Sequence, residues 1–432
     1  MTRGQKLLLI GIAYAGFVVL GLPSGLLGVA WPSIRGAFGL SLDAVGMLFV
    51  ASTVGYLLSS FSSGPLISRI GVGTLLVVSS LVAGMGLLGY SVAPAWWFMV
   101  LCGLFAGAGG GAIDAGLNSY FATNYGANLM NWLHACFGLG ATLGPVVMTT
   151  LLNLGQSWRW GYVVVAVPQV LFALCLALTR GRWRLGGSQS TTDWERNGTT
   201  DWERNGTTDW ERNGTTDWER NGTTDWERNG TTDWERNGSR TGKVSGAATL
   251  RLPVVWFGIA LFFVFTGIEG GTGQWPYSLF TEARGVAPSI AGLWVSIYWG
   301  SLTVGRMIFG LIMDRLGVVR TLRACMIGVI LGSACVWCNV GVVSFVGLAL
   351  IGFCLAPLFP SLISVTPGRV GDAHAANAIG FQVASASLGI AIIPGLAGVL
   401  AARLGLEIVG PFLLVTSIVM FLLHEVIIRR QS

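Results

Sequence analysis

Long apolar segments, separated by short polar turns, follow one another along almost the whole chain. Each is at least as long as the roughly 20 residues that a helix needs to cross a membrane. The first six segments lie at 6–31, 43–64, 73–93, 96–122, 128–153 and 157–179. The last six lie at 252–281, 288–313, 321–340, 342–364, 375–402 and 406–428. The pattern predicts an all-α membrane protein with twelve transmembrane helices.

A charged turn recurs after the second and after the eighth of these segments. The later copy consists of Gly310, Asp314, Arg315, Gly317 and Arg320. The earlier copy, 246 residues before it, keeps Gly64, Arg69 and Gly71 and has Ser68 in place of the aspartate. Because ions are costly to bury in hydrocarbon, both turns are expected at the membrane surface.

A second repeat divides the chain in the same way. Residues of the fifth segment recur in the eleventh at a constant offset of 249: Asn128, Gly140 and Pro145 reappear as Asn377, Gly389 and Pro394. Such parallel repeats are typical of alternating-access transporters, which place a site between two moving halves. We therefore expect two six-helix bundles, at 1–184 and 249–432, related by a pseudo-twofold axis.

Residues 185–248 between the bundles have a different character. They contain six identical copies of Thr-Thr-Asp-Trp-Glu-Arg-Asn-Gly, at 191–238. Each copy has one aromatic residue, three charged residues and a turn-forming Asn-Gly, without an apolar periodicity that could build a core. We expect a disordered linker. An alternative is that the regularly spaced tryptophans dock a partner, which would suit a membrane sensor that does not transport.

Composition and charge agree with a membrane protein, since 53% of the residues are hydrophobic and 11% are charged. Outside the repeats, Lys and Arg gather on the side that holds both termini, whereas the other side has Arg35, Arg159, Arg284 and Arg403. By the positive-inside rule, both termini and the linker are cytoplasmic and the protein lies in the cell membrane. The net charge of +6 does not indicate a nucleic-acid partner, because no basic cluster is interleaved with aromatic residues.

The chain shows no pattern typical of an enzyme. All seven cysteines lie inside apolar segments, which indicates small packing residues and not a disulfide framework. The three histidines are far apart, and no nucleophile–base set, metal-ligand cluster or cofactor loop stands outside the apolar segments. We expect no metal and no cofactor apart from a coupling ion, H⁺ or Na⁺, and a monomer whose partners are a small solute and the lipid bilayer.

A few polar side chains inside the apolar segments are candidates for a solute site, because each ionisable one costs about 2.5–3.5 kcal/mol to insert. Asp114 and Asn118 are one turn apart on the fourth helix. A neighbouring ridge of glycines, Gly103, Gly107 and Gly111, predicts close packing on another helix.

The fifth helix carries a polar stripe of Asn128, Asn131 and His134. A neutral histidine can donate and accept hydrogen bonds at once, which suits a hydroxylated solute or a relayed proton. A structural hydrogen bond between helices is an equally open interpretation of His134.

The seventh helix contains Glu269, Gln274 and Trp275 in a stretch that glycines and Pro276 loosen. The tryptophan offers a flat apolar face for a sugar ring, although an interfacial anchor is a comparable role. Gln382 in the eleventh helix is a weaker candidate of the same kind. Arg306 is expected to extend toward the membrane surface in a structural role.

The two charged turns resemble the loop signature of the major facilitator superfamily. The motifs around Asp114, His134 and Glu269 are similar to those of its fucose:proton symporter branch, which includes sodium-dependent glucose transporter-like proteins. The resemblance implies that Asp114 and Asn118 handle the substrate and the proton, and that the charged turns act as a gate. The acidic residue in that symporter's first helix has no counterpart in 21–28. Coupling could therefore run through Glu269, use sodium or be absent.

Three functions remain open at this stage. The first is a carrier that imports a sugar or a similar solute by alternating access, with proton symport. The second is proton-coupled efflux of an apolar or cationic compound, because the run from Gly140 to Pro145 looks like part of an antiporter signature. The third is the sensor that uses the tryptophan repeats.

Overall fold

The computed structural model describes residues 3–125, 127–183 and 244–430. The chain forms two compact units, Met1–Leu185 together with Thr249–Ser432, and Gly186–Ala248. In the second unit the described part is residues 244–248, which enter the single turn α11 (Gly246–Thr249). The six repeats lie outside the described residues, so the linker interpretation stays a prediction.

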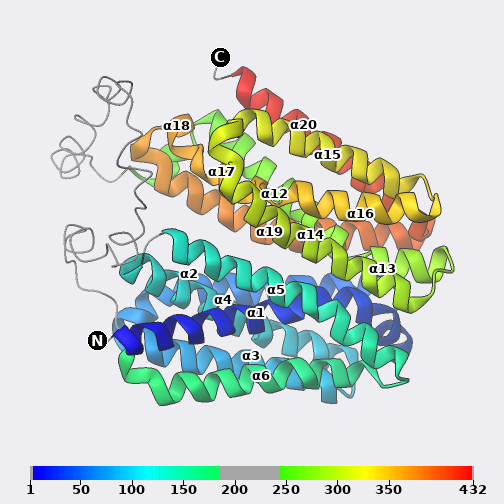
Figure 1. The fold of residues 1–432 in the computed structure, drawn as a ribbon, viewed down its shortest axis with the longest axis horizontal. Coiled ribbons are helices and arrows are strands. Elements are labelled where there is room, and N and C mark those ends of the chain that lie inside the picture. Colours follow the sequence, from blue (N-terminus) through cyan, green and yellow to red (C-terminus); the bar gives the residue numbers. More distant parts are fainter. Residues whose placement is uncertain (1–2, 126, 184–243, 431–432) are drawn as a thin grey trace, which may run out of the picture. The chain divides into compact units, whose positions relative to one another are not determined.

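Within the first unit, twelve helices are long and apolar enough to cross a membrane, which confirms the predicted fold class. The N-terminal bundle consists of α1 (Arg3–Phe38), α2 (Val45–Ile70), α3 (Val72–Val92), α4 (Trp96–Asn124), α5 (Ala127–Asn153) and α6 (Trp158–Thr179). The C-terminal bundle consists of α12 (Pro253–Gln274), α14 (Pro288–Leu316), α15 (Val318–Trp337), α16 (Gly341–Leu355), α19 (Asp372–Leu404) and α20 (Val409–Arg429). Figure 1 shows the two sets as separate layers, the first in blue to blue-green and the second in green to red.

Short elements connect or extend these helices. They are η1 (Leu42–Ala44), η2 (Arg180–Arg182), α13 (Pro276–Ser278), η3 (Leu279–Ala283), α17 (Leu358–Ser364), α18 (Thr366–Val370) and η4 (Leu406–Ile408). The seventh span breaks between α12 and α13, where Pro276 has no amide hydrogen to donate. The loosening predicted for this stretch is therefore confirmed.

The ends of the membrane-spanning helices form two opposite faces. The terminal face is where α1 begins and α20 ends; the far face holds the α1–α2, α5–α6 and α19–α20 turns (Figure 1). Both copies of the charged turn lie at the terminal face and fold alike. Gly71 and Gly317 have φ of 78° and 80°, a conformation that favours glycine, and their amides donate to Ile67 O and Met313 O at 2.9 and 3.0 Å.

Glycines set the distances between helices inside each bundle. A Cβ added to Gly107 on α4 would lie 1.9 Å from the carbonyl oxygen of Ser52 on α2, and the neighbouring ridge glycines also meet α2. The predicted close packing of this ridge is confirmed. The repeat pair Gly140 and Gly389 marks equivalent crossings, because a Cβ added to each would lie 2.0 Å from Val18 O and 2.1 Å from Phe263 O, respectively. The duplication seen in the sequence is thus a duplication of helix contacts.

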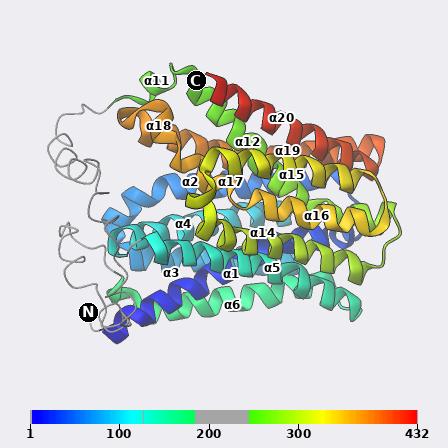
Figure 2. The same ribbon diagram turned by 45° about the horizontal axis from the view of Figure 1, so that its top comes forward.

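The two bundles meet along what we call the seam, formed by α1 against α12, α2 against α19, and α5 against α14 (Figure 2). Small residues close it in the half nearer the far face: Gly28 lies against Gly273 O, Gly46 against Gly395, and Gly292 against Thr149. At the far face, Arg35 on α1 pairs with Glu282 on η3 at 2.5 Å.

Nearer the terminal face, glycines of three of these helices have open space beside them. A Cβ added to Gly64 on α2, Gly310 on α14 or Gly380 on α19 would meet no described atom within 4 Å. The seam is therefore closed toward the far face, and α2, α14 and α19 have freedom to approach other helices at the terminal face.

Candidate functional site

Asp114 lies at the centre of a hydrogen-bonded group that joins α2 to α4. The Tyr56 hydroxyl donates to Asp114 Oδ2 at 2.7 Å, and Asn118 Nδ2 donates to Asp114 Oδ1 at 3.0 Å. The predicted placement of Asp114 and Asn118 one turn apart on one face of α4 is confirmed, and the structure adds the hydrogen bond between them. Close packing explains the tyrosine, because Gly111 on α4 fits against the backbone of Tyr56. All three side chains are half-buried, so the carboxylate is both anchored and accessible.

His134 on α5 lies between the two bundles' charged groups. Its ring is exposed, makes an edge contact with Phe17 at 5.4 Å, and interacts electrostatically with Asp114 and with Arg306 on α14. The described structure shows no hydrogen bond between helices through His134. The side chain of Asn131, predicted on the same stripe, lies outside the described residues.

An ion pair in the C-terminal bundle completes the group. Arg306 Nη2 lies 3.6 Å from Glu269 Oε1, with 25% and 14% of the two side chains exposed. The Tyr298 hydroxyl donates to the backbone oxygen of Glu269 at 2.8 Å and fixes α12 against α14. The expectation that Arg306 extends toward the membrane surface is wrong, because attraction to a carboxylate inside the protein holds it there.

Together these side chains form what we call the polar cluster: Tyr56, Asp114 and Asn118 in one bundle, Glu269 and Arg306 in the other, and His134 between them. Its two carboxylates are not equivalent. Glu269 has a guanidinium partner, whereas the hydrogen bonds to Asp114 come from a phenol and an amide. With His134 neutral, the cluster has one more negative than positive charge. A charge without a counterion is costly at this depth, so Asp114 is the group that gains most from a proton or a cation.

Three predicted site residues have contacts elsewhere in this conformation. Trp275 is fully buried and its indole nitrogen donates to Pro394 O at 2.9 Å. Gln382 accepts from the Thr366 hydroxyl at 3.0 Å, next to Gly258. Gln274 is 3% exposed on the seam and has no hydrogen-bond partner for its Nε2 among the described residues. A role for these three in binding stays a prediction.

The residues of the charged turns are exposed at the terminal face, including Gly64, Arg69, Arg315 and Arg320. None of these arginines forms an ion pair with a described residue. The Asp314 side chain lies outside the described residues. Their role as a gate therefore remains a prediction from the resemblance.

Sequence reasoning missed Tyr56 and misjudged Arg306. Tyr56 is 58 positions from Asp114, and no spacing rule links residues on two different helices across such a distance. A usable signal was a phenol in an otherwise apolar and small-residue span, opposite the glycine ridge of α4.

Tyr56→Phe is expected to make the charged form of Asp114 less favourable without unfolding the protein. The substitution removes a hydrogen bond to the charged form of Asp114, so that form becomes less favourable and the pH dependence of transport shifts to higher pH. Transport measured across a pH series tests this. The matched control is Tyr14→Phe, which removes a hydroxyl that donates to Leu129 O and leaves the polar cluster intact. An identical pH profile for both variants would contradict the assignment.

Comparison with known proteins identifies the family. The model of the Major Facilitator Superfamily matches residues 13–280 and 257–431. The chain belongs to the Major Facilitator Superfamily. It is therefore a multi-pass secondary transporter and not an enzyme, as the sequence predicted.

Individual relatives are distant. Bypass of stop codon protein 6 of Saccharomyces cerevisiae is 22% identical, over 94% of this chain and 80% of its own. The glucose/mannose transporter GlcP of Bacillus subtilis is 20% identical, over 92% and 88%.

Solved structures share the fold. A bacterial homolog of the human lysosomal transporter Spinster, inward-facing and occupied, superposes with a TM-score of 0.72 at 11% identity, over 99% of this chain and 98% of that one. The Escherichia coli fucose:proton symporter FucP superposes with a TM-score of 0.59 at 13% identity, over 97% and 98%. At these identities the structures show the fold alone, so the predicted fucose symporter branch stays a prediction.

Proposed function

We propose that this transporter imports a neutral, polyhydroxylated solute, most simply a monosaccharide, together with a proton. The observation that carries the proposal is the inequality of the two carboxylates in the polar cluster. Glu269 is neutralised within its own bundle by Arg306, and Asp114 has neutral donors alone. A proton on Asp114 removes the excess charge, and the remaining amide, phenol and imidazole groups suit solute hydroxyls.

Coupling follows if the proton and the solute favour the same state. An ion drives transport only when it binds one conformation, or one loaded state, better than another. Protonated Asp114 would bind the solute more tightly when the far face is open, and loss of the proton at the terminal face would weaken binding and release the solute. We further propose that the terminal face is cytoplasmic, as the distribution of Lys and Arg predicts.

The sugar class is supported by one full-length relative and by the chemistry of the cluster. The glucose/mannose transporter GlcP aligns over nearly the whole chain. A neutral sugar adds no charge to a group that already carries an excess negative charge. A carboxylate solute would instead have to displace Glu269 from Arg306, and a metal cation would leave the hydroxyl-binding groups unused.

Proteoliposomes test the proposal directly. Radiolabelled D-glucose, D-mannose, D-xylose and L-fucose are offered with and without a pH gradient, alkaline inside. We expect at least one sugar to accumulate above its external concentration when the gradient is present, and to equilibrate when it is absent. Equal uptake under both conditions would rule out proton symport.

Proton-coupled efflux predicts a different result. Cells that express the protein would then resist toxic apolar or cationic compounds, whereas a sugar importer confers no resistance. The glycines that prompted this alternative have a packing role, because Gly140 and Gly144 on α5 lie against the backbone of α1. Deleting residues 191–238 distinguishes a carrier from a sensor, because a carrier keeps its transport and a sensor loses its function.

A further inference from the structure

Several neutral polar side chains are sealed inside the closed half of the seam without partners. Thr149 on α5, Gln274 at the end of α12 and Trp299 on α14 are 7%, 3% and 5% exposed. Thr149 Oγ1, Gln274 Nε2 and Trp299 Nε1 have no hydrogen-bond partner among the described residues. Buried polar groups are nearly always bonded, so three unpartnered ones along one interface require an explanation.

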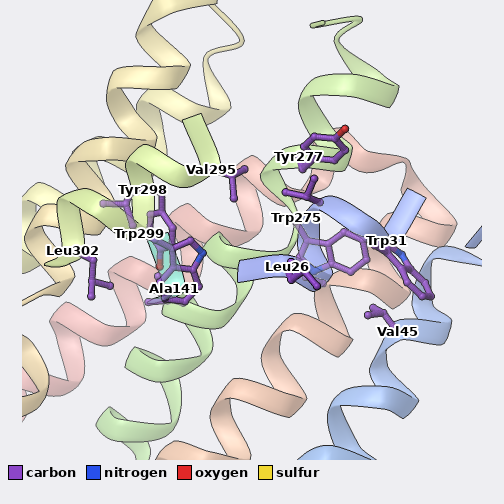
Figure 3. Packing of buried hydrophobic residues seen from close by; sticks show 14 of the residues in the cluster. Leu26, Trp31, Val45, Ala141, Trp275, Tyr277, Val295, Tyr298, Trp299 and Leu302 are labelled. Carbon is purple, nitrogen blue, oxygen red and sulfur yellow. The ribbon is translucent and has the colours of Figure 1, made fainter. Parts of the chain in front are cut away.

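Thr149 and Gln274 lie at contacts across the seam, and Trp299 lies beside Gln274. Thr149 Oγ1 is the atom nearest to the place of a Cβ on Gly292, across the seam between α5 and α14. The backbone of Gln274 lies against Gly28, across the seam between α1 and α12. The Trp299 ring packs on Gly273, the neighbour of Gln274. Figure 3 shows its indole nitrogen on the side of the ring that faces Leu26 and Trp275.

Two half-buried hydroxyls of the seam do have partners, and they provide a comparison for Thr149. The hydroxyls of Thr142 on α5 and Thr303 on α14 donate to carbonyl oxygens of their own helices, Gly138 O and Trp299 O, at 2.8 and 2.9 Å. A threonine in this interface can thus be satisfied locally, and the Thr149 hydroxyl is not. In this conformation Thr149, Gln274 and Trp299 therefore each bury a polar atom without a described hydrogen-bond partner.

We propose that Thr149, Gln274 and Trp299 form an outer solute subsite, which binds a neutral polyhydroxylated molecule when the far face is open. The inference rests on the import function proposed above. Two N–H donors and one hydroxyl, with no charge among them, match sugar hydroxyls, and the indole adds a flat apolar surface for a ring. Closing the seam strips the solute from these groups and leaves it to the polar cluster. The subsite is therefore distinct from Asp114 and carries no proton.

The test combines thermal stability with transport in Thr149→Val and Gln274→Leu. A group that is unpartnered in this state loses nothing when it becomes apolar, so we expect the melting temperature of the purified protein to stay the same or rise. Uptake into cells of whichever of D-glucose, D-mannose, D-xylose or L-fucose the wild type transports should show a KM about tenfold higher, the effect of one lost hydrogen bond, with Vmax retained. Thr149→Ser, which keeps the hydroxyl, should restore the wild-type KM.

Thr142→Val is the matched control, because it removes a seam hydroxyl that bonds to its own helix. It should leave KM unchanged. Wild-type KM in Thr149→Val and Gln274→Leu, or a fall in melting temperature with no change in KM, would overturn the subsite while the wild type still transports. Absence of transport of all four sugars by the wild type is a separate result, which overturns the proposed function and the subsite with it.

Discussion

Asp114→Asn is expected to abolish accumulation of the solute against its gradient while leaving solute exchange intact. The amide has nearly the same shape as the carboxylate and can still pair with Tyr56 and Asn118. It cannot bind a proton at neutral pH, and an ion that does not bind supplies no driving force. In proteoliposomes with a pH gradient, the internal solute concentration should stop at the external concentration. Counterflow, in which labelled solute enters against unlabelled solute inside, should persist.

The control for this prediction is Asp372→Asn. Asp372 is an exposed carboxylate in the first turn of α19, at the terminal face and outside the polar cluster. The Asp372→Asn variant carries the same chemical change and should accumulate solute like the wild type. Gradient-driven accumulation by Asp114→Asn at the wild-type level would remove Asp114 from the coupling mechanism. Loss of counterflow in the same variant would assign Asp114 to solute binding instead.

Gly107→Ala is expected to cause the largest loss of stability among single-methyl substitutions on α4. The new Cβ would lie 1.9 Å from the Ser52 carbonyl oxygen, which is backbone and cannot turn aside. Helices α2 and α4 must therefore separate, at a cost of about 1–3 kcal/mol, the usual range for overpacking. The same movement withdraws Tyr56 from Asp114, so proton-coupled uptake should fall as well.

Gly110→Ala on the same helix is the matched control. The nearest atom to its new Cβ is Leu20 Cδ1, at 3.6 Å, which is ordinary contact. Alanine favours a helix over glycine by about 1 kcal/mol, so this variant should be as stable as the wild type or more so. Thermal unfolding of both purified variants gives the comparison. Similar melting temperatures for the two would show that α2 and α4 do not cross as closely as described.

The fold could be predicted from the sequence because its determinants are local. Membrane-length apolar runs give the spans, and the glycines of the repeated turns recur where helices must end in a left-handed conformation, as at Gly71 and Gly317. The glycine ridge on α4 also follows from spacing along one helix. The helix that packs on this ridge, α2, cannot be predicted from that spacing, because the choice depends on packing between distant segments.

The site was predictable in part for the same reason. Asp114 and Asn118 lie one turn apart on one helix, and their hydrogen bond follows from helical geometry. Tyr56 and Arg306, the partners of Asp114 and Glu269, come from other helices of the same bundle, and the sequence gives no distance between helices. Trp275 and Gln274 are buried by packing between distant segments, and no sequence pattern gives that burial.

The central claim is that solute and proton cross together through the polar cluster. The most direct measurement is the pH inside wild-type proteoliposomes, followed with a lumenal pH dye while the transported sugar is added outside, with no pH gradient at the start. We expect the lumen to acidify when sugar is added, and not before, and we expect no acidification with Asp114→Asn. Entry of sugar with no change in lumenal pH, or with alkalinisation of the lumen, would contradict the account.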